Sequence, residues 1–230
     1  MSDTLYQAAA LILPLVVAIV FHEVAHGYVA QELGDPTASE LGRLSLNPFR
    51  HVDPVGTVVL PGLLALAHLP VFGWAKPVPV VAGRLGNPRR DMMLVALAGP
   101  GSNLVLAAIG ALLLGLLSRW LGGGPDAGGV ARFVALNLFN FISVNVFLAL
   151  FNLLPIPPFD GSHVVEGLLP RRAAAAFGRV RQVGFMLALA LLIVLPTLLP
   201  GFDPVGKVVG PPVNWLLGHY FDLADLVANV

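Results

Sequence analysis

The chain opens with a run of eighteen residues without a charged side chain, Thr4 to Phe21. A helix needs about twenty mostly apolar residues to cross the hydrocarbon core of a bilayer. Further uncharged runs lie at 92–118, 133–159 and 182–202. We therefore predict an all-α polytopic membrane protein with about four transmembrane helices.

The composition agrees with a membrane protein. Hydrophobic residues make up 57% of the chain and charged residues 11%, against about 45–50% and 25% in soluble domains. Thirteen basic and thirteen acidic residues give no net charge, so the chain lacks the basic footprint of a nucleic-acid binder. Cysteine is absent, so any zinc must be held by histidine and carboxylate side chains.

The first uncharged run leads directly into His22-Glu23-Val24-Ala25-His26. Positions i and i+4 of a helix lie on one face, so His22 and His26 can bind one metal ion. This is the HExxH arrangement of zinc proteases, in which the glutamate acts as general base. The alternative is a pair of structural histidines bonded to neighbouring helices. Ionisable residues inside a membrane favour a functional site.

A catalytic zinc site needs three protein ligands, and HExxH supplies two. The extended pattern HExxHxxGxxH is excluded, because Val29 and Glu32 stand at its glycine and third histidine. Glu32 or Glu40 could be proposed instead, but Glu32 lies ten residues beyond His22 on the same helix, too far along it to share one ion. Asp160 fits better, because an unpaired carboxylate is costly in an unwound turn at the end of an apolar helix. An ordinary Asp-Gly turn is its alternative reading.

Several segments are expected to depart from plain helix. Residues 42–49 show alternation and a closing proline, and residues 76–80 contain two prolines that disfavour helix. We predict that both are short membrane-associated β segments. Residues 54–75 are uncharged but interrupted by proline and glycine, which indicates a re-entrant or broken segment. The small-residue cluster at 99–103 permits close helix approach and a local break.

Two motifs together resemble the site-2 protease family of intramembrane zinc metalloproteases. They are HEVAHG at residues 22–27 and NLLPIPPFDG at residues 152–161. Segments at 42–47, 73–79 and 98–103 are similar to the compact bacterial and archaeal branch. The resemblance covers about residues 5 to 165.

The resemblance implies a ligand set and a reaction. By it, His22, His26 and Asp160 match the ligands of one Zn²⁺ per chain, and Glu23 matches the catalytic base. Asn152 matches a family asparagine near the active site, where it could donate to the oxyanion or hold the substrate backbone. The alternative is a structural hydrogen bond between helices of the bundle. The implied partners are transmembrane protein or peptide substrates and the lipid bilayer, in a bacterial or archaeal cytoplasmic membrane. The oligomeric state stays open.

The domain organisation follows from the same pattern. We expect residues 1–203 to form one membrane-embedded metalloprotease domain and residues 204–230 to form a tail that reads as an interfacial helix. A membrane transporter could use the intramembrane histidines and aspartate as an ion or substrate pathway, but no repeat symmetry is visible. A non-catalytic adaptor would lose Glu23 or a ligand, and all four are present.

The ligand set also predicts a topology. His22 and His26 lie towards the end of the first helix, and Asp160 lies at the end of the helix that begins near Phe133. One zinc can join them only if both ends reach the same face, so residues 54–75 should dip into the membrane and return. Basic loops then place that face in the cytoplasm and the N-terminus outside.

Overall fold

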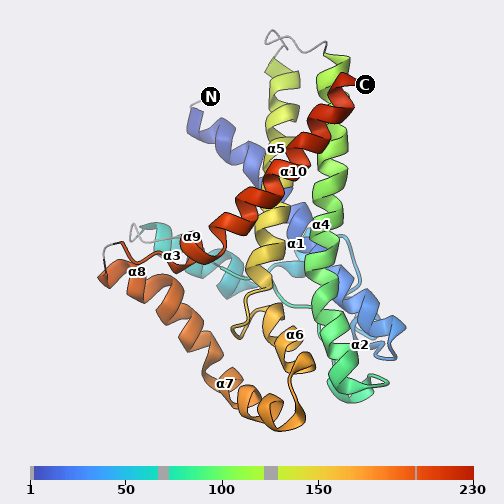
Figure 1. The fold of residues 1–230 in the computed structure, drawn as a ribbon, viewed down its shortest axis with the longest axis vertical. Coiled ribbons are helices and arrows are strands. Elements are labelled where there is room, and N and C mark those ends of the chain that lie inside the picture. The colour runs from blue at the N-terminus through green and yellow to red at the C-terminus, as the bar shows by residue number, and fades with distance from the viewer. Residues whose placement is uncertain (1–2, 67–72, 122–128, 200) are drawn as a thin grey trace. The chain divides into compact units, whose positions relative to one another are not determined.

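The computed structural model describes residues 3–66, 73–121, 129–199 and 201–230, and every regular element among them is a helix (Figure 1). The longer helices are α1 Asp3–Glu32, α4 Pro88–Trp120, α5 Gly129–Asn152, α7 Arg171–Leu189 and α10 Gly210–Asn229. The shorter helices are α2 Thr37–Glu40, η1 Pro48–His51, η2 Pro54–Val59, α3 Leu60–Leu66, η3 Ala82–Arg84, α6 Asp160–Leu168, η4 Ala190–Val194, α8 Leu195–Leu198 and α9 Pro204–Val208.

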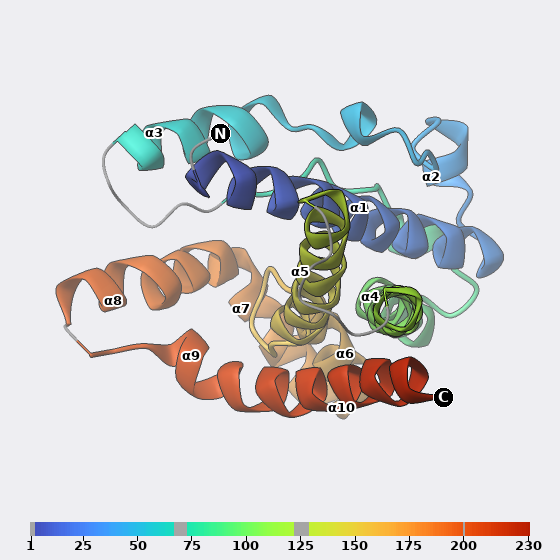
Figure 2. The same ribbon diagram turned by 90° about the horizontal axis from the view of Figure 1, so that it is seen from above.

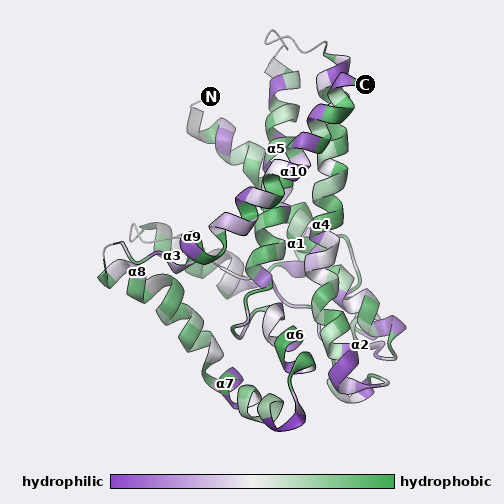
Figure 3. Ribbon diagram, viewed as in Figure 1, coloured by the Kyte–Doolittle hydropathy of each residue, from purple (hydrophilic) through white to green (hydrophobic). Residues whose placement is uncertain are grey.

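Three of the described helices are long and apolar enough to cross a membrane. The candidate spans are Leu5–Glu32, Pro88–Trp120 and Gly129–Asn152, and Figure 3 shows their mostly hydrophobic colouring. A fourth span results if α7 and its continuation through α8 are counted as one, with a bend of 65° between its two parts. The protein is therefore a multi-pass membrane protein with three or four spans, close to the predicted four.

The ends of the spans follow local chain chemistry. Gly34 adopts a φ of +107°, the left-handed conformation that commonly ends a helix, so α1 stops at Glu32, just before it. Pro100 lies inside α4, which continues to Trp120. The predicted local break at residues 99–103 is therefore wrong: a membrane helix tolerates the missing N–H of one proline without ending.

Two compact units share the chain, and each contains parts of the long helices. The first comprises residues 1–18, 100–152 and 205–230. Within it, α10 lies across α4 and α5 (Figures 1 and 2), and Ala224 of α10 packs with Ile142 of α5 in a buried cluster. Asn103 and Asn145, both fully buried, are joined by a hydrogen bond of 2.7 Å. This hydrogen bond between two buried amides links α4 to α5 within the unit.

The second unit comprises residues 19–99 and 153–204 and includes the segment predicted to re-enter the membrane. The N–H of Trp74 donates to the carbonyl of Gly56 at 3.1 Å, and the N–H of Lys76 donates to the carbonyl of His51 at 2.8 Å. Both ends of the 54–75 segment therefore lie side by side, which agrees with a chain that returns. Its residues 67–72 lie outside the described residues.

The predicted β segments are wrong, since the described residues contain no strand. In residues 42–47, Gly42 has a φ of +62° and the N–H of Ser45 turns back to the carbonyl of Arg43. In residues 76–80, Pro77 and Pro79 have no N–H to donate to a ladder. Their neighbours bond instead to side chains and loop carbonyls.

Candidate metal centre

Three side chains predicted as zinc ligands meet within the second unit. His22 Nε2 lies 3.1 Å from Asp160 Oδ2 and 3.1 Å from His26 Nε2. The third side of this triangle, between His26 Nε2 and Asp160 Oδ2, measures 3.3 Å. Asp160 is 138 residues beyond His22 in the chain, so the fold alone brings it to the two histidines.

The size of this triangle suits zinc. Ligand bonds of about 2.0–2.1 Å in tetrahedral geometry place the ligand atoms about 3.3 Å apart. Both histidines are buried, and the side chain of Asp160 is 20% exposed. Two imidazole nitrogens and one carboxylate oxygen are a donor set that catalytic zinc uses, and they leave the fourth tetrahedral position open.

A carbonyl of α4 determines the tautomer of His26. Its Nδ1 lies 2.7 Å from the carbonyl oxygen of Val95. A carbonyl can only accept, so Nδ1 carries the proton and Nε2 keeps its lone pair towards His22 and Asp160. Such a hydrogen bond behind a ligating imidazole fixes its orientation. Sequence reasoning missed Val95, because nothing in its side chain marks it.

Asp160 is placed by the tight turn that follows α5. It is the first residue of α6, with Phe159 as the N-cap, and not a turn residue as predicted. A Cβ at Gly161 would stand 2.1 Å from the carbonyl oxygen of Leu153, so only glycine allows this turn to close on the start of α6. The Asp-Gly pair therefore has a structural reason: the glycine lets the aspartate reach the histidines.

Glu23 lies on α1 between the two histidines in sequence and is partly buried. Its Oε2 accepts a hydrogen bond of 2.8 Å from the backbone N–H of Val78. One turn further along α1, Gly27 also packs closely against Val78 and Leu44. A Cβ added at Gly27 would stand 2.6 Å from a side-chain atom of each. Sequence reasoning missed the Val78 contact, although the prolines on both sides of Val78 signalled an unusual segment.

Asn152, which the sequence singled out, and His163 are further polar residues near the second motif. The side-chain amide of Asn152 donates to the carbonyl of Leu148 in its own helix, at 3.0 Å. His163 lies on α6, and its Nδ1 is 3.3 Å from Arg181. Burial, together with the positive charge of Arg181, lowers the pKa of His163. Neither residue belongs to the ligand triangle.

Asp35 ties the end of α1 to the loop that precedes α4. Its carboxylate is fully buried and accepts hydrogen bonds from the hydroxyl and N–H of Thr37 and from the N–H of Val81. Burial by itself raises the pKa of Asp35, but these hydrogen bonds outweigh it and hold the pKa below its ordinary value. Close by, Arg84 pairs with Glu40 at 2.7 Å.

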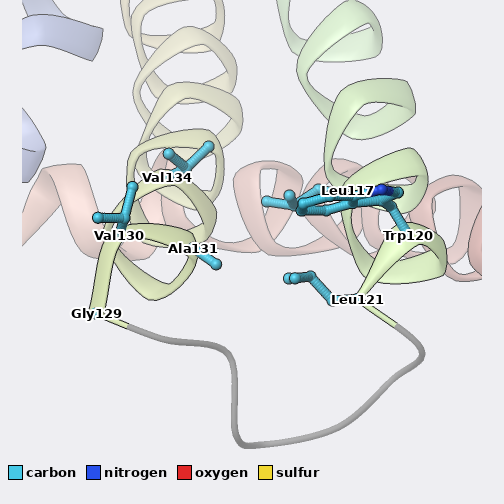
Figure 4. Close-up of a pocket in the computed structure, with 7 residues that line it drawn as sticks. All are labelled: Leu117, Trp120, Leu121, Gly129, Val130, Ala131 and Val134. Atoms are coloured by element: carbon cyan, nitrogen blue, oxygen red, sulfur yellow. The ribbon is translucent and has the colours of Figure 1, made fainter.

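A pocket of a different kind lies in the first unit, between the last turn of α4 and the first turn of α5 (Figure 4). Its lining is apolar: Leu117, Trp120, Leu121, Gly129, Val130, Ala131 and Val134. Among the described residues that line it, none has a titratable or metal-ligating side chain.

Comparison with known proteins connects the triangle to a family. Residues 125–195, which include Asp160, match the model described as Peptidase family M50. The chain is 40% identical over 188 residues to "Putative zinc metalloprotease YwhC" of Bacillus subtilis, and the match covers 80% of each chain. It is 33% identical over 214 residues to "Putative zinc metalloprotease Rip2" of Mycobacterium tuberculosis, covering 91% of this chain and 72% of the relative. No solved structure matches the chain.

Proposed function

This chain belongs to peptidase family M50, the zinc metalloproteases of the site-2 type, and we propose that it cleaves transmembrane substrates with Glu23 as the general base. His22, His26 and Asp160 are the proposed ligands of one Zn²⁺. Membership of a protease family weighs against the transporter and adaptor readings.

The observation that carries this proposal is the ligand triangle. Three atoms from two distant parts of the chain lie 3.1–3.3 Å apart, which is about the spacing of one face of a zinc tetrahedron. Glu23 follows the first of these residues directly, at the position that the general base occupies in HExxH. The triangle also joins the two motifs that carry the resemblance to the family, HEVAHG at residues 22–27 and NLLPIPPFDG at residues 152–161.

The residues divide the reaction between them. Zinc, when bound, polarises a water molecule and the substrate carbonyl. Glu23 takes the proton of the attacking water and delivers it to the departing amine. One water is consumed, one peptide bond breaks, and the glutamate ends as it began. Asn152 is the proposed donor to the oxyanion or to the substrate backbone.

The proposed substrate is a membrane-spanning segment. The spans of this protein expose large apolar side chains, such as Leu13 and Val105 at about 60% exposure, which suits contact with lipid. A helical substrate holds its carbonyls in intrahelical hydrogen bonds, so it must unwind before the carbonyl can be attacked. Bacterial relatives favour a cytoplasmic membrane as the location.

Residues 204–230 form a C-terminal tail beyond the proposed metalloprotease domain at residues 1–203. We propose that α10 lies at the membrane interface, because its outward face carries polar groups beside an exposed tryptophan. These exposed residues are Asn214, Trp215, His219, Asp222 and Asp225. Such a face is too polar for the hydrocarbon core.

Replacement of Glu23 tests the reaction. Glu23→Gln removes the base and no proposed ligand, so it should keep one zinc per chain and abolish cleavage of a model transmembrane peptide. The matched control is Glu32→Gln, which changes an exposed glutamate of the same helix and should retain cleavage. Zinc is measured by elemental analysis and cleavage by mass spectrometry of the products. Cleavage by the Glu23→Gln enzyme would overturn the mechanism.

A further inference from the structure

The carboxylate of Glu23 is held from outside its own helix. Its Oε2 accepts a hydrogen bond from the N–H of Val78, 55 residues further along the chain. Val78 is 7% exposed and lies in residues 74–81, which we call the strap. Hydrogen bonds to an ionised carboxylate are short and strong, so this contact restricts where the carboxylate can point.

The extended course of the strap presents the N–H of Val78 as a donor. In an extended chain the N–H groups of alternate residues point to the same side. Trp74 and Lys76 donate to the carbonyls of Gly56 and His51, and the next N–H on this side belongs to Val78. Pro77 and Pro79 on either side of it have no N–H. Val78 therefore supplies the one backbone N–H among residues 77–79, and the opposite side of the strap presents no donor at the two prolines.

Both ends of the strap are anchored by groups outside it. Arg43 donates to the carbonyl of Lys76 at 2.8 Å and to that of Pro77 at 3.3 Å. At the other end, the N–H of Val81 donates to the buried carboxylate of Asp35. Between these anchors the strap cannot move along α1 without breaking hydrogen bonds at both ends.

The approach of the strap to α1 depends on Gly27, one turn after Glu23. A Cβ at position 27 would stand 2.6 Å from Val78 Cγ1 and 3.0 Å from Ala38 Cβ. Because Gly27 has no side chain, the strap can lie close to α1, and the N–H of Val78 reaches the carboxylate of Glu23.

From these contacts we propose that the backbone amide of Val78 is a positioning group for Glu23, holding its carboxylate in the orientation in which it accepts the proton of the attacking water. The bond uses one carboxylate oxygen, and the reaction needs the other. This proposal rests on the proposed function, in which Glu23 is the base. Val78 itself is not a catalytic residue.

The contact is tested without any catalysis by hydrogen–deuterium exchange. Residues 76–81 contain four backbone amides, since two of the six residues are proline. In Glu23→Ala the exchange of the Val78 amide should rise by about tenfold or more, because a bond to a charged acceptor is lost. In Glu23→Gln it should stay protected, because the glutamine carbonyl still accepts. The Lys76 and Val81 amides are internal references and should not change.

The effect on the reaction is tested by Val78→Pro, which removes the N–H and keeps an apolar side chain. It should hold one zinc per chain and keep KM, while kcat falls on the order of 100-fold, as expected for a displaced catalytic group. The matched control is Val80→Pro, since among the described residues the N–H of Val80 has no assigned hydrogen bond. This control should keep kcat within about threefold.

The two proposals fail in different ways. If Val78→Pro binds zinc and keeps kcat while Glu23→Gln is inactive, the positioning role is wrong and Glu23 remains the base. If Glu23→Gln cleaves, the base assignment is wrong, and the positioning proposal falls with it. If Val78→Pro loses zinc, the exchange experiment decides: unchanged protection of the Val78 amide in Glu23→Ala would overturn the proposal, and its loss would support it.

Discussion

Gly99 of α4 lies directly against the imidazole of His26, so that a Cβ at position 99 would stand 2.5 Å from Nε2. The same Cβ would stand 2.7 Å from Cε1 of His22. Close approach of α4 therefore depends on a glycine, and this approach also brings the carbonyl of Val95 to the other nitrogen of His26.

Gly99→Ala should consequently displace both histidines and lower zinc occupancy. The matched control is Gly101→Ala in the same helix, where a Cβ would meet nothing within 4 Å. That variant should bind zinc normally and gain about 1 kcal/mol of helix stability, the usual difference between alanine and glycine. Elemental analysis and thermal unfolding of both variants check this. Full zinc occupancy in Gly99→Ala would show that α4 can shift away at no cost to the site.

Asp160→Ala removes one corner of the ligand triangle. The chain then offers only two imidazoles as ligands at this site. Loss of a residue that merely hydrogen-bonds to a metal ligand lowers metal affinity by about 10–100-fold, so loss of a ligand should lower the zinc affinity by more. Cleavage should fall with it. Asp222→Ala, at an exposed position of α10, is the control and should leave the affinity unchanged. Zinc competition with a chelator measures both. Normal zinc affinity in Asp160→Ala would mean that another residue is the third ligand.

Asp35 should make the stability of the protein depend on pH. Its folded-state pKa is lowered, so its stabilisation is complete above the unfolded value of about 3.9 and is lost as pH falls through the folded pKa. Asp35→Asn leaves a buried N–H donor of Thr37 or Val81 facing an amide N–H₂, which should cost about 1–3 kcal/mol near pH 7. The difference from wild type should narrow below about pH 4. Denaturant unfolding in detergent at several pH values measures it, and a difference that does not change with pH would contradict the assignment.

Membrane topology can be measured in this cysteine-free chain with single cysteines and an impermeant thiol reagent. Arg84 bonds to Glu40 and Thr37, so the regions before and after the 54–75 segment lie together. Cysteines at Ser39 and Gly83 should therefore be labelled from the same side, which we predict to be cytoplasmic. Gly83 leaves the Arg84–Glu40 pair intact.

A cysteine at Arg119 is the internal comparison for this experiment. The 33 residues of α4 span about 50 Å, enough to cross the membrane once, so Arg119 should be labelled from the side opposite Gly83. Labelling of Ser39 and Gly83 from opposite sides would mean that residues 54–75 cross the membrane completely.

Most of the helical architecture was predictable, because its signals are local. Uncharged runs long enough to span a bilayer became α1, α4 and α5, and the left-handed Gly34 follows the end of α1. Two predictions that rested on proline residues were wrong. Pro100 did not interrupt α4, and the proline-rich strap did not become a strand. A single missing N–H does not by itself decide whether a helix ends or a strand forms, so proline alone did not predict these elements.

The candidate site divides in the same way. That His22, Glu23 and His26 share one stretch of helix follows from local pattern, because i and i+4 spacing is a property of the helix alone. The sequence also offered Asp160, through the cost of a carboxylate at the end of an apolar helix. Long-range folding is what places Asp160 3.1 Å from His22, the carbonyl of Val95 at His26, and the N–H of Val78 at Glu23. Two of these three contacts use backbone atoms, which every residue possesses, so their geometry exists only once the chain has closed around α1.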